Sequence, residues 1–299
     1  MAAIELDEKR GALRDVAVGK GQLATVRMLQ KNYGEALELH QEAKSIFEQY
    51  REPRHVAVAW HQIGMVHQHV GNYTAAEKAY QESLAIKIRE NNKQGEAASL
   101  GQLGRLYDDM DRLEDAVRMY ERVADLYTTL GNLEGEGRLR NNMAISLMKL
   151  NRMPEARTQL LRAIECKSQL GHAAEPWTTW AILCELEKAE GNYQSAAEAR
   201  LKAMQAYAAY RKDGGESQAN QYNFLLATAQ ALEAGEQEKL IQYLQSTLEP
   251  NDPLTYTSLI NTLIAILRGI HDPALVEDPE LYYMDAVDLK LLFFNGAGL

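Results

Sequence analysis

The 299-residue sequence is poor in cysteine, proline and phenylalanine, and it has no long apolar run. Its two cysteines, Cys166 and Cys184, show neither CxxC spacing nor a histidine partner pattern, so they form no metal or redox motif. The scarce proline, together with abundant Ala, Leu, Glu and Gln, is typical of helices. Without a run of 18 apolar residues or the apolar core of a signal peptide, we expect a soluble, cytoplasmic protein.

Basic residues are also in deficit. The 32 Lys and Arg face 42 Asp and Glu, which leaves a net charge of −10. A protein that binds nucleic acid or an anionic membrane would need a basic stripe, so we expect neither as a partner.

Catalytic signatures are missing as well. The sequence has no glycine-rich phosphate loop, no His-Glu-x-x-His and no Gly-x-Ser-x-Gly. His61, His67 and His69 are close enough in sequence to suggest a metal site, but their helical spacing favours structural roles. We therefore expect no enzymatic activity, no cofactor and no metal.

A repeat with a strict 40-residue period dominates the sequence. The segment 71–76, Gly-Asn-Tyr-Thr-Ala-Ala, returns at 191–196 as Gly-Asn-Tyr-Gln-Ser-Ala, and related segments begin at Lys31, Asp111 and Asn151. Five copies without insertion predict a stack of one supersecondary unit. Such a solenoid offers a long curved surface for holding another molecule rather than a pocket for chemistry.

Each copy predicts two helices. In the second copy, residues 54–70 and 74–90 carry apolar side chains at helical spacing, on either side of a Gly71-Asn72 break. Short helix pairs cannot bury both faces alone, so the copies must stack. One slot of the first helix stays small, which predicts close approach of the two helices of a pair: Ala24, Gly64, Gly104, Ala144 and Cys184.

The constant slots resemble the signature of the tetratricopeptide repeat (TPR). The second copy shows it at Trp60, Ile63, Gly64, His67, Ala76, Tyr80 and Ser83, and the third at Leu100, Leu103, Gly104, Tyr107, Ala116 and Tyr120. A period of 40 rather than about 34 is similar to the long-helix TPRs of kinesin light chains and of the Leu-Gly-Asn repeat family. The resemblance implies an all-α, right-handed α-solenoid. His40 in the first copy and Arg200 in the fifth depart from the expected aromatic residue.

The domain organisation follows from where the repeat weakens. We expect five 40-residue repeats over 1–211, a degenerate sixth helix pair over 212–249 and C-terminal capping helices over 250–299. Asp252-Pro253 and Asp278-Pro279 predict helix starts.

For the cap we predict that six residues bury against the sixth pair: Leu254, Leu259, Leu263, Ile266, Leu289 and Leu292. The alternative is that residues 291–294, Leu-Leu-Phe-Phe, form a docking strip. The tail from residue 271 is also similar to the ends of TPR regions in bacterial STAND-type signalling ATPases. That resemblance implies an alternative function, the ligand-sensing region of a larger signal-transduction ATPase.

A ladder of carboxamides is the strongest functional signal. Gln22, Gln62, Gln102 and Asn142 recur at 40-residue intervals, and the series ends at Ile182. In long-helix TPR families this slot faces the inner groove, so the resemblance implies contact with the backbone of a bound peptide, for which a carboxamide has both a donor and an acceptor. The alternative is that the carboxamides hydrogen-bond the neighbouring repeat.

Six further residues are expected to flank the ladder and tune specificity: His61, Met65, His69, Arg105, Arg138 and Asn141. Arg105, Arg138 and Lys149 make the middle locally positive, which would suit an acidic or C-terminal peptide. The cluster Asp108, Asp109 and Asp111 predicts a solvated charge run or a contact with a basic partner. We predict a peptide- or protein-binding scaffold, monomeric or weakly dimeric, that holds an extended segment of its partner.

Overall fold

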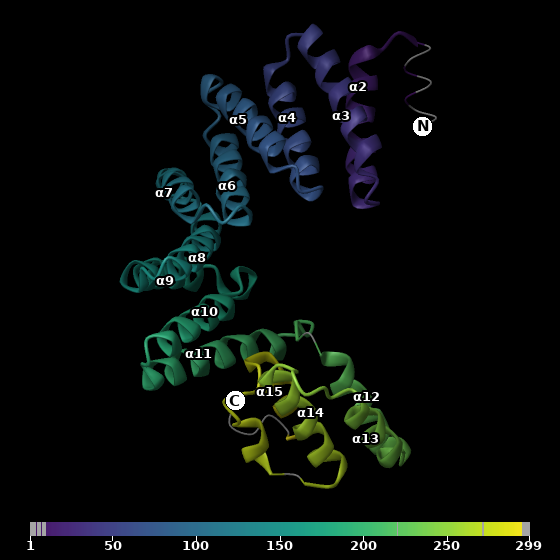
Figure 1. The fold of residues 1–299 in the computed structure, drawn as a ribbon, viewed down its shortest axis with the longest axis vertical. Helices are drawn as coiled ribbons and strands as arrows, with labels where there is room; N and C mark the ends of the chain where they lie inside the picture. Colours follow the sequence, from purple (N-terminus) through teal and green to yellow (C-terminus); the bar gives the residue numbers. More distant parts are fainter. Residues whose placement is uncertain (1–3, 5–6, 8–9, 220, 271, 295–299) are drawn as a thin grey trace. The chain divides into compact units, whose positions relative to one another are not determined.

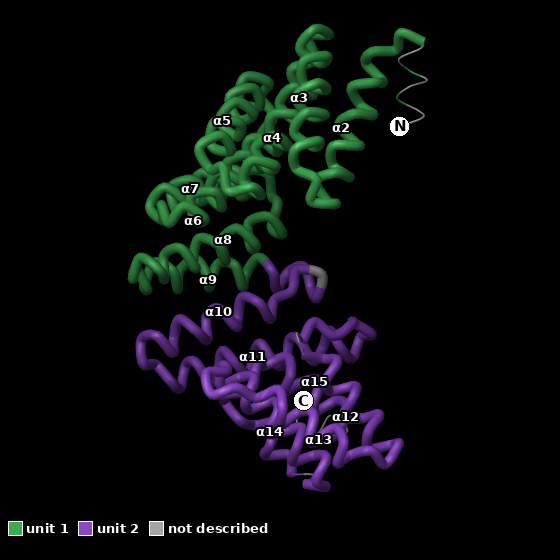
Figure 2. Tube along the Cα trace, turned by 45° about the vertical axis from the view of Figure 1, so that its right-hand side comes forward, with its two compact units in different colours: residues 1–166 green, residues 167–299 purple. Residues whose placement is uncertain are grey.

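The computed structural model describes residues 4, 7, 10–219, 221–270 and 272–294, which form α-helices and two short 3-10 helices and, within these ranges, no strand (Figure 1). The chain divides into two compact units, residues 1–166 and 167–299 (Figure 2). None of the described helices is both long and apolar enough to cross a membrane.

The first unit is a run of helix pairs: α2 (Leu13–Leu29) with α3 (Tyr33–Gln49), α4 (Pro53–His69) with α5 (Tyr73–Arg89), α6 (Lys93–Asp109) with α7 (Leu113–Leu130), and α8 (Leu133–Lys149) with α9 (Met153–Ser168), whose last residues belong to the second unit. Each pair begins 40 residues after the one before. The fold is therefore the all-α solenoid that the period predicts.

Local chemistry ends and restarts each helix. Gly71, between α4 and α5, has a φ of 76°, a left-handed conformation that glycine adopts without strain. The side chain of the next residue, Asn72, accepts a hydrogen bond from the Ala75 amide and so caps the free N–H groups at the start of α5. Asn92 and Asn132 cap α6 and α8 in the same way. At Gly71-Asn72 and Gly131-Asn132 the dipeptide therefore ends one helix and caps the next.

The small slot lets an aromatic ring pack on the facing helix. A Cβ atom added at Gly64 would lie 2.6 Å from Cε1 of Tyr80, and one added at Gly104 would lie 2.7 Å from Cδ1 of Tyr120. Both tyrosines are fully buried. Glycine is therefore required wherever the second helix carries Tyr in this slot, as the sequence predicts.

The second unit contains α10 (Pro176–Ala189), α11 (Tyr193–Lys212), α12 (Tyr222–Ala234), α13 (Gln237–Ser246), α14 (Leu254–Leu267) and α15 (Tyr283–Phe293), with 3-10 helices at Gly171–Ala174 and Pro273–Val276. One core joins these elements, and α15 packs against α11 as well as α12. Its centre holds Trp177, Tyr207 and Leu225 with residues of α14 and α15.

Two details of the predicted cap are wrong. Leu254 is 68% exposed and Leu292 is 36% exposed, whereas the other four predicted leucines and isoleucines are buried. Leu254 is the first residue of α14, where a side chain lies beyond the end of the core. The strip 291–294 is mostly part of the core: Phe294 is buried, and Leu291 and Phe293 pack on the core in part.

The two Asp-Pro helix starts also differ from expectation. Pro253 is the N-cap of α14 rather than its first helical residue. Asp278-Pro279 opens no helix, because α15 begins only at Tyr283. The Asp278 carboxylate instead accepts hydrogen bonds from the Glu280 amide and the Ser258 hydroxyl, which closes a loop. An Asx turn and a helix N-cap share the same sequence signal, so local pattern alone does not separate them.

Candidate functional site

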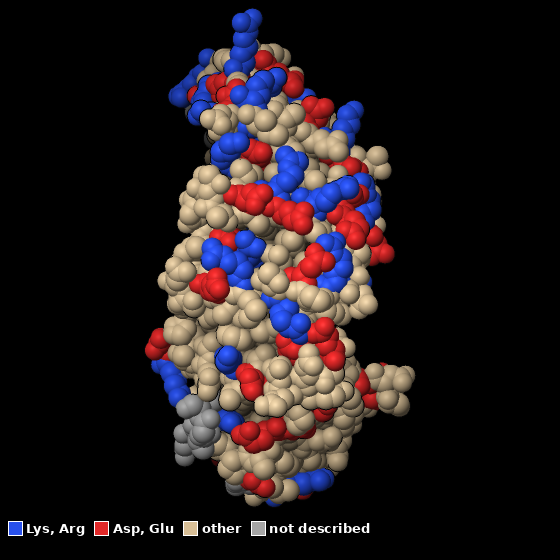
Figure 3. All heavy atoms as spheres, turned by 90° about the vertical axis from the view of Figure 1, so that its left-hand side faces the viewer, with Lys and Arg blue, Asp and Glu red and all other residues tan. Residues whose placement is uncertain are grey.

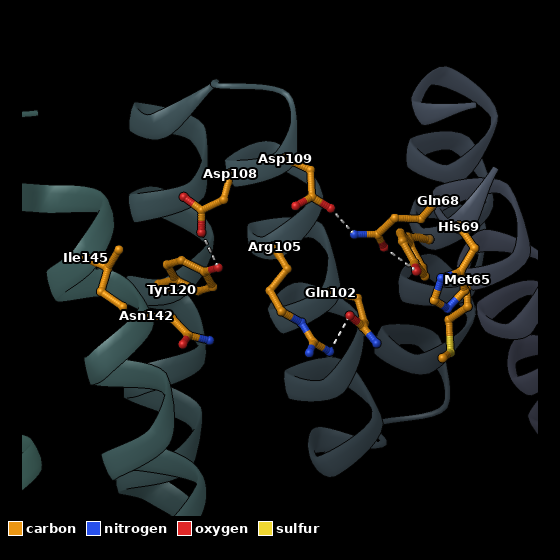
Figure 4. Close-up of a pocket in the computed structure, with 11 residues that line it drawn as sticks. Met65, Gln68, His69, Gln102, Arg105, Asp108, Asp109, Tyr120, Asn142 and Ile145 are labelled. Atoms are coloured by element: carbon orange, nitrogen blue, oxygen red, sulfur yellow. Dashed lines mark hydrogen bonds between the residues drawn. The ribbon is translucent and has the colours of Figure 1, made fainter. Parts of the chain in front are cut away.

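Two adjoining cavities lie along the first helices of consecutive repeats in the first unit. The first, of about 540 Å³, is lined by residues of α4, α6 and α8, with Tyr80 and Tyr120 from the second helices (Figure 4). The second, of about 420 Å³, is lined by α6 and α8 together with His61 of α4 and two residues of α7. Gln102, Arg105 and Asn142 line both cavities. We call the two cavities together the inner groove.

Seven of the ten predicted site residues line this groove. Met65 and His69 line the first cavity, His61 and Arg138 line the second, and the three shared residues line both. Gln22, Gln62 and Asn141 line neither. Asn141 is only 7% exposed, so its side chain faces the packed interior rather than the groove.

The hydrogen bonds of the ladder bear on its two possible roles. The Gln102 carboxamide oxygen accepts a hydrogen bond from Arg105 of the same helix (Figure 4). Gln22, Gln62 and Asn142 form no side-chain hydrogen bond to any other described residue, and the Gln62 Oε1 is buried without a partner there. Among the described residues, then, no ladder carboxamide joins one repeat to the next.

Gln68 and Asp108, rather than the ladder carboxamides, link neighbouring repeats by hydrogen bonds. The Tyr80 hydroxyl donates to Gln68 Oε1 at 2.8 Å, and Gln68 Nε2 donates to Asp109 Oδ2 of the next first helix at 2.6 Å. Forty residues on, the Tyr120 hydroxyl donates to Asp108 Oδ2 at 2.6 Å. The other oxygen of Asp108 accepts from Ser146 of α8 at 2.6 Å.

These bridges were not predicted, although their spacing is visible in the sequence. Gln68 and Asp108 are 40 residues apart, and each precedes its tyrosine by 12. Each oxygen of Asp108 thus accepts a hydrogen bond from a neighbouring helix, although the residue is only half-buried and still lines the first cavity. Burial, and then the hydrogen bond to Asp108, raises the pKa of Tyr120, so its hydroxyl remains a donor.

Charge is divided within the groove. Asp108 and Asp109 line only the first cavity, whereas the second has His61, Arg105 and Arg138 and no carboxylate in its lining. Burial, and then the charges of Lys87 and Arg105, lowers the pKa of His61 to about 4, so this imidazole is neutral near neutral pH.

On the face shown in Figure 3, basic and acidic side chains are intermixed rather than gathered by sign.

The three neighbouring histidines are not brought together. The His69 ring stacks on Tyr33 with centroids 5.8 Å apart, while His61 packs against Tyr80 with centroids 5.5 Å apart. No group of three His, Cys, Asp or Glu side chains in the described part of the chain could hold a metal ion.

Comparisons with known proteins match part of the repeat region to a known family. Residues 56–129 match the tetratricopeptide repeat family model. No curated protein matches the sequence. Solved structures match more widely: BtubC (BKLC) from P. vanneervenii has a TM-score of 0.62 at 17% identity, over 69% of this chain and 86% of that one.

Two further structures agree. A protein from Podosopora anserina with nearly identical TPR-like repeats, named as a kinesin light chain, has a TM-score of 0.57 at 17% identity, over 65% of this chain and 96% of that one. The apo form of RapI has a TM-score of 0.60 at 14% identity, over 94% of this chain and 99% of that one. At such identities the likeness shows the fold alone. Residues 56–129 thus match the tetratricopeptide repeat family, the other helix pairs share the fold of the solved repeat structures, and proteins built from such repeats are generally protein-interaction scaffolds.

Proposed function

We propose that the protein is a non-enzymatic scaffold that binds an extended segment of a protein partner in the inner groove. The observation that carries the proposal is that Gln102, Arg105 and Asn142 line both cavities, so one continuous polar row crosses from α6 to α8. An extended segment lying across this row would meet carboxamides one repeat apart.

The free hydrogen-bonding capacity of this row supports backbone recognition. The Asn142 carboxamide has no side-chain hydrogen bond to another described residue, and Gln102 uses only its oxygen, toward Arg105. Each therefore retains an N–H donor for a peptide carbonyl. Backbone recognition does not depend on the side chains of the ligand, so Arg105 of the row and the flanking Met65 and Arg138 would supply sequence preference.

The Tyr and Gln or Asp bridges give the groove a fixed shape. They hold α4, α6 and α8 at set positions before any ligand arrives, which lowers the ordering cost of binding. The exposed apolar Ile145, at 40% exposure, lies in the same lining and offers contact to an apolar side chain of the segment.

The experiment selects peptides from a random display library on the full chain and then measures their dissociation constants. The double variant Gln102→Ala/Asn142→Ala should bind the selected peptides at least about tenfold more weakly, as expected for two lost hydrogen bonds of about 1 kcal/mol each. Gln41→Ala is the matched control, because Gln41 is an exposed carboxamide on α3 outside the groove. Equal affinity of all three proteins, with unchanged unfolding, would exclude the row from the site.

A further inference from the structure

Arg200 departs from the repeat in a way that the fold explains only in part. It occupies the slot that holds Tyr80 and Tyr120 in earlier repeats, on the second helix of its pair. Its Nη2 donates to the backbone oxygens of Asp278 and Leu281, at 3.0 Å each, and so holds the loop before α15. These two hydrogen bonds occupy one terminal nitrogen of the guanidinium, Nη2.

The other terminal nitrogen, Nη1, has only a weak hydrogen-bond acceptor. Nη1 of Arg200 faces the sulfur of Met204 at 3.3 Å, and a thioether is a weak acceptor. No carboxylate of the described chain lies within ion-pair distance of Arg200. Burial lowers the pKa of this arginine, as expected of a cation taken from water.

A cavity of about 450 Å³ opens beside this guanidinium, within the second unit. Three cations line it, Lys188, Arg200 and Lys290, against a single carboxylate, Glu277. The remaining walls are largely apolar, with Tyr193, Ala196, Ala197, Leu201, Met204 and Pro279. Pockets of about 300–1,000 Å³ with apolar walls and a few placed polar groups are typical of small-molecule sites.

Glu277 occupies the anionic position only loosely. Its Oε1 lies 2.7 Å from Nζ of Lys290, a side chain that is only 6% exposed, whereas Glu277 itself is 65% exposed. Lys188 is paired with Glu185 at 3.1 Å, and both side chains are open to solvent. A ligand carboxylate could therefore replace the exposed carboxylate of Glu277 without opening the core.

The geometry points to this cavity as a binding site for a small carboxylic acid with an apolar body. Its carboxylate meets Lys290 and the Nη1 of Arg200, where it replaces the weak thioether acceptor, and its hydrocarbon part lies against Leu201, Met204 and the ring of Tyr193. The assignment is independent of the inner groove, which lies in the other unit.

The test uses the full chain with 4-phenylbutanoate and its neutral amide as probes, followed by titration calorimetry and by the ¹⁵N signal of Arg200 Nε. The acid should bind one to one and shift that signal, and the amide should bind at least about tenfold more weakly, the loss expected for a charge-assisted hydrogen bond.

Variants at exposed positions keep the fold intact. Ala197→Phe fills the cavity and should abolish binding, whereas Ala209→Phe, an exposed site on the same helix outside the lining, should not change it. Glu277→Gln should tighten binding several-fold because it removes the competing carboxylate, and Glu238→Gln, at an exposed residue of α13 outside the lining, is the control for the same change of charge.

Three results would overturn the assignment. They are equal binding of acid and amide, binding of the acid that survives Ala197→Phe, and no binding of the acid at all. A peptide with an apolar last residue that binds only with a free C-terminus, when the free acid does not, would reassign the cavity to a protein partner.

Discussion

Replacing Gly104 by alanine tests the close packing inside a repeat. The added Cβ would lie 2.7 Å from Cδ1 and 2.9 Å from Cζ of Tyr120, distances that real Cβ atoms do not adopt. The ring cannot easily retreat, because Tyr120 is fully buried and its hydroxyl is bound to Asp108 at 2.6 Å.

The magnitude follows from two opposing effects. Overpacking a core costs about 1–3 kcal/mol, while glycine to alanine within a helix contributes about 1 kcal/mol of stability. We expect Gly104→Ala to lower the free energy of unfolding by up to about 2 kcal/mol. Gly101, in the same helix, has nothing within 4 Å of an added Cβ. Gly101→Ala should therefore stabilise the protein by up to about 1 kcal/mol.

Urea unfolding followed by circular dichroism measures both variants. The opposite sign of the two effects is the decisive feature, because helix propensity alone predicts the same gain at both sites. A rescue variant, Gly104→Ala/Tyr120→Leu, recreates the Ala144 and Leu160 pair of the fourth repeat, whose two side chains are fully buried. If Gly104→Ala is as stable as Gly101→Ala, the account of the small slot is wrong.

Three other perturbations have defined outcomes in the same unfolding assay. Asp108→Ala leaves the buried Tyr120 hydroxyl without its acceptor, while the Ser146 hydroxyl keeps the backbone oxygen of Asn142, and should cost about 1–3 kcal/mol; Asp109→Ala at the exposed neighbour should cost less than about 1 kcal/mol. Burial, and then the charge of Asp288, raises the pKa of Asp285 from 3.8 to about 7, so the folded state favours the protonated acid and its stabilisation is lost as pH rises through about 7. Asp285→Asn should therefore be more stable than the wild type at about pH 8, by up to about 4 kcal/mol, with a smaller difference at about pH 5; equal stability at both would contradict the shift. Truncation after Glu249 removes α14 and α15 from the core of the second unit and should cause aggregation or loss of its cooperative unfolding; a soluble and equally stable product would reject their role as a cap.

The helix pairs could be predicted because their signals are local. Gly71 ends one helix and Asn72 caps the next within a few residues. The small residue at Gly64 is needed because the ring of Tyr80 packs against it. A period that repeats without insertion then propagates each local assignment along the chain.

The candidate site was predictable only in part. Seven predicted groove residues do line the cavities, and all seven lie on the first helices of their repeats, α4, α6 and α8. The bridges through Gln68 and Asp108 were missed, since a hydrogen bond between helices depends on side-chain geometry as well as spacing. Asn141 was placed in the groove by its neighbours in sequence, but its side chain is buried in the packed interior.

Beyond the repeats, the sequence pattern loses its predictive value. Asp278-Pro279 carries the signal of a helix start and forms a loop, held from outside by Arg200. Arg200, in the fifth repeat, departs from the aromatic residue of the TPR signature. Its side chain instead donates hydrogen bonds to backbone oxygens 78 and 81 residues away. Long-range contacts of this kind leave no periodic trace.

Photo-crosslinking from a single position tests the central claim most directly. Benzoylphenylalanine at Ile145, in the lining of the first cavity, should crosslink to a peptide selected on the full chain, and excess unlabelled peptide should abolish the product. The same group at Val58, an exposed residue of α4 outside both cavities, should give no product. Equal crosslinking from the two positions, or crosslinking from Val58 and none from Ile145, would contradict binding in the inner groove.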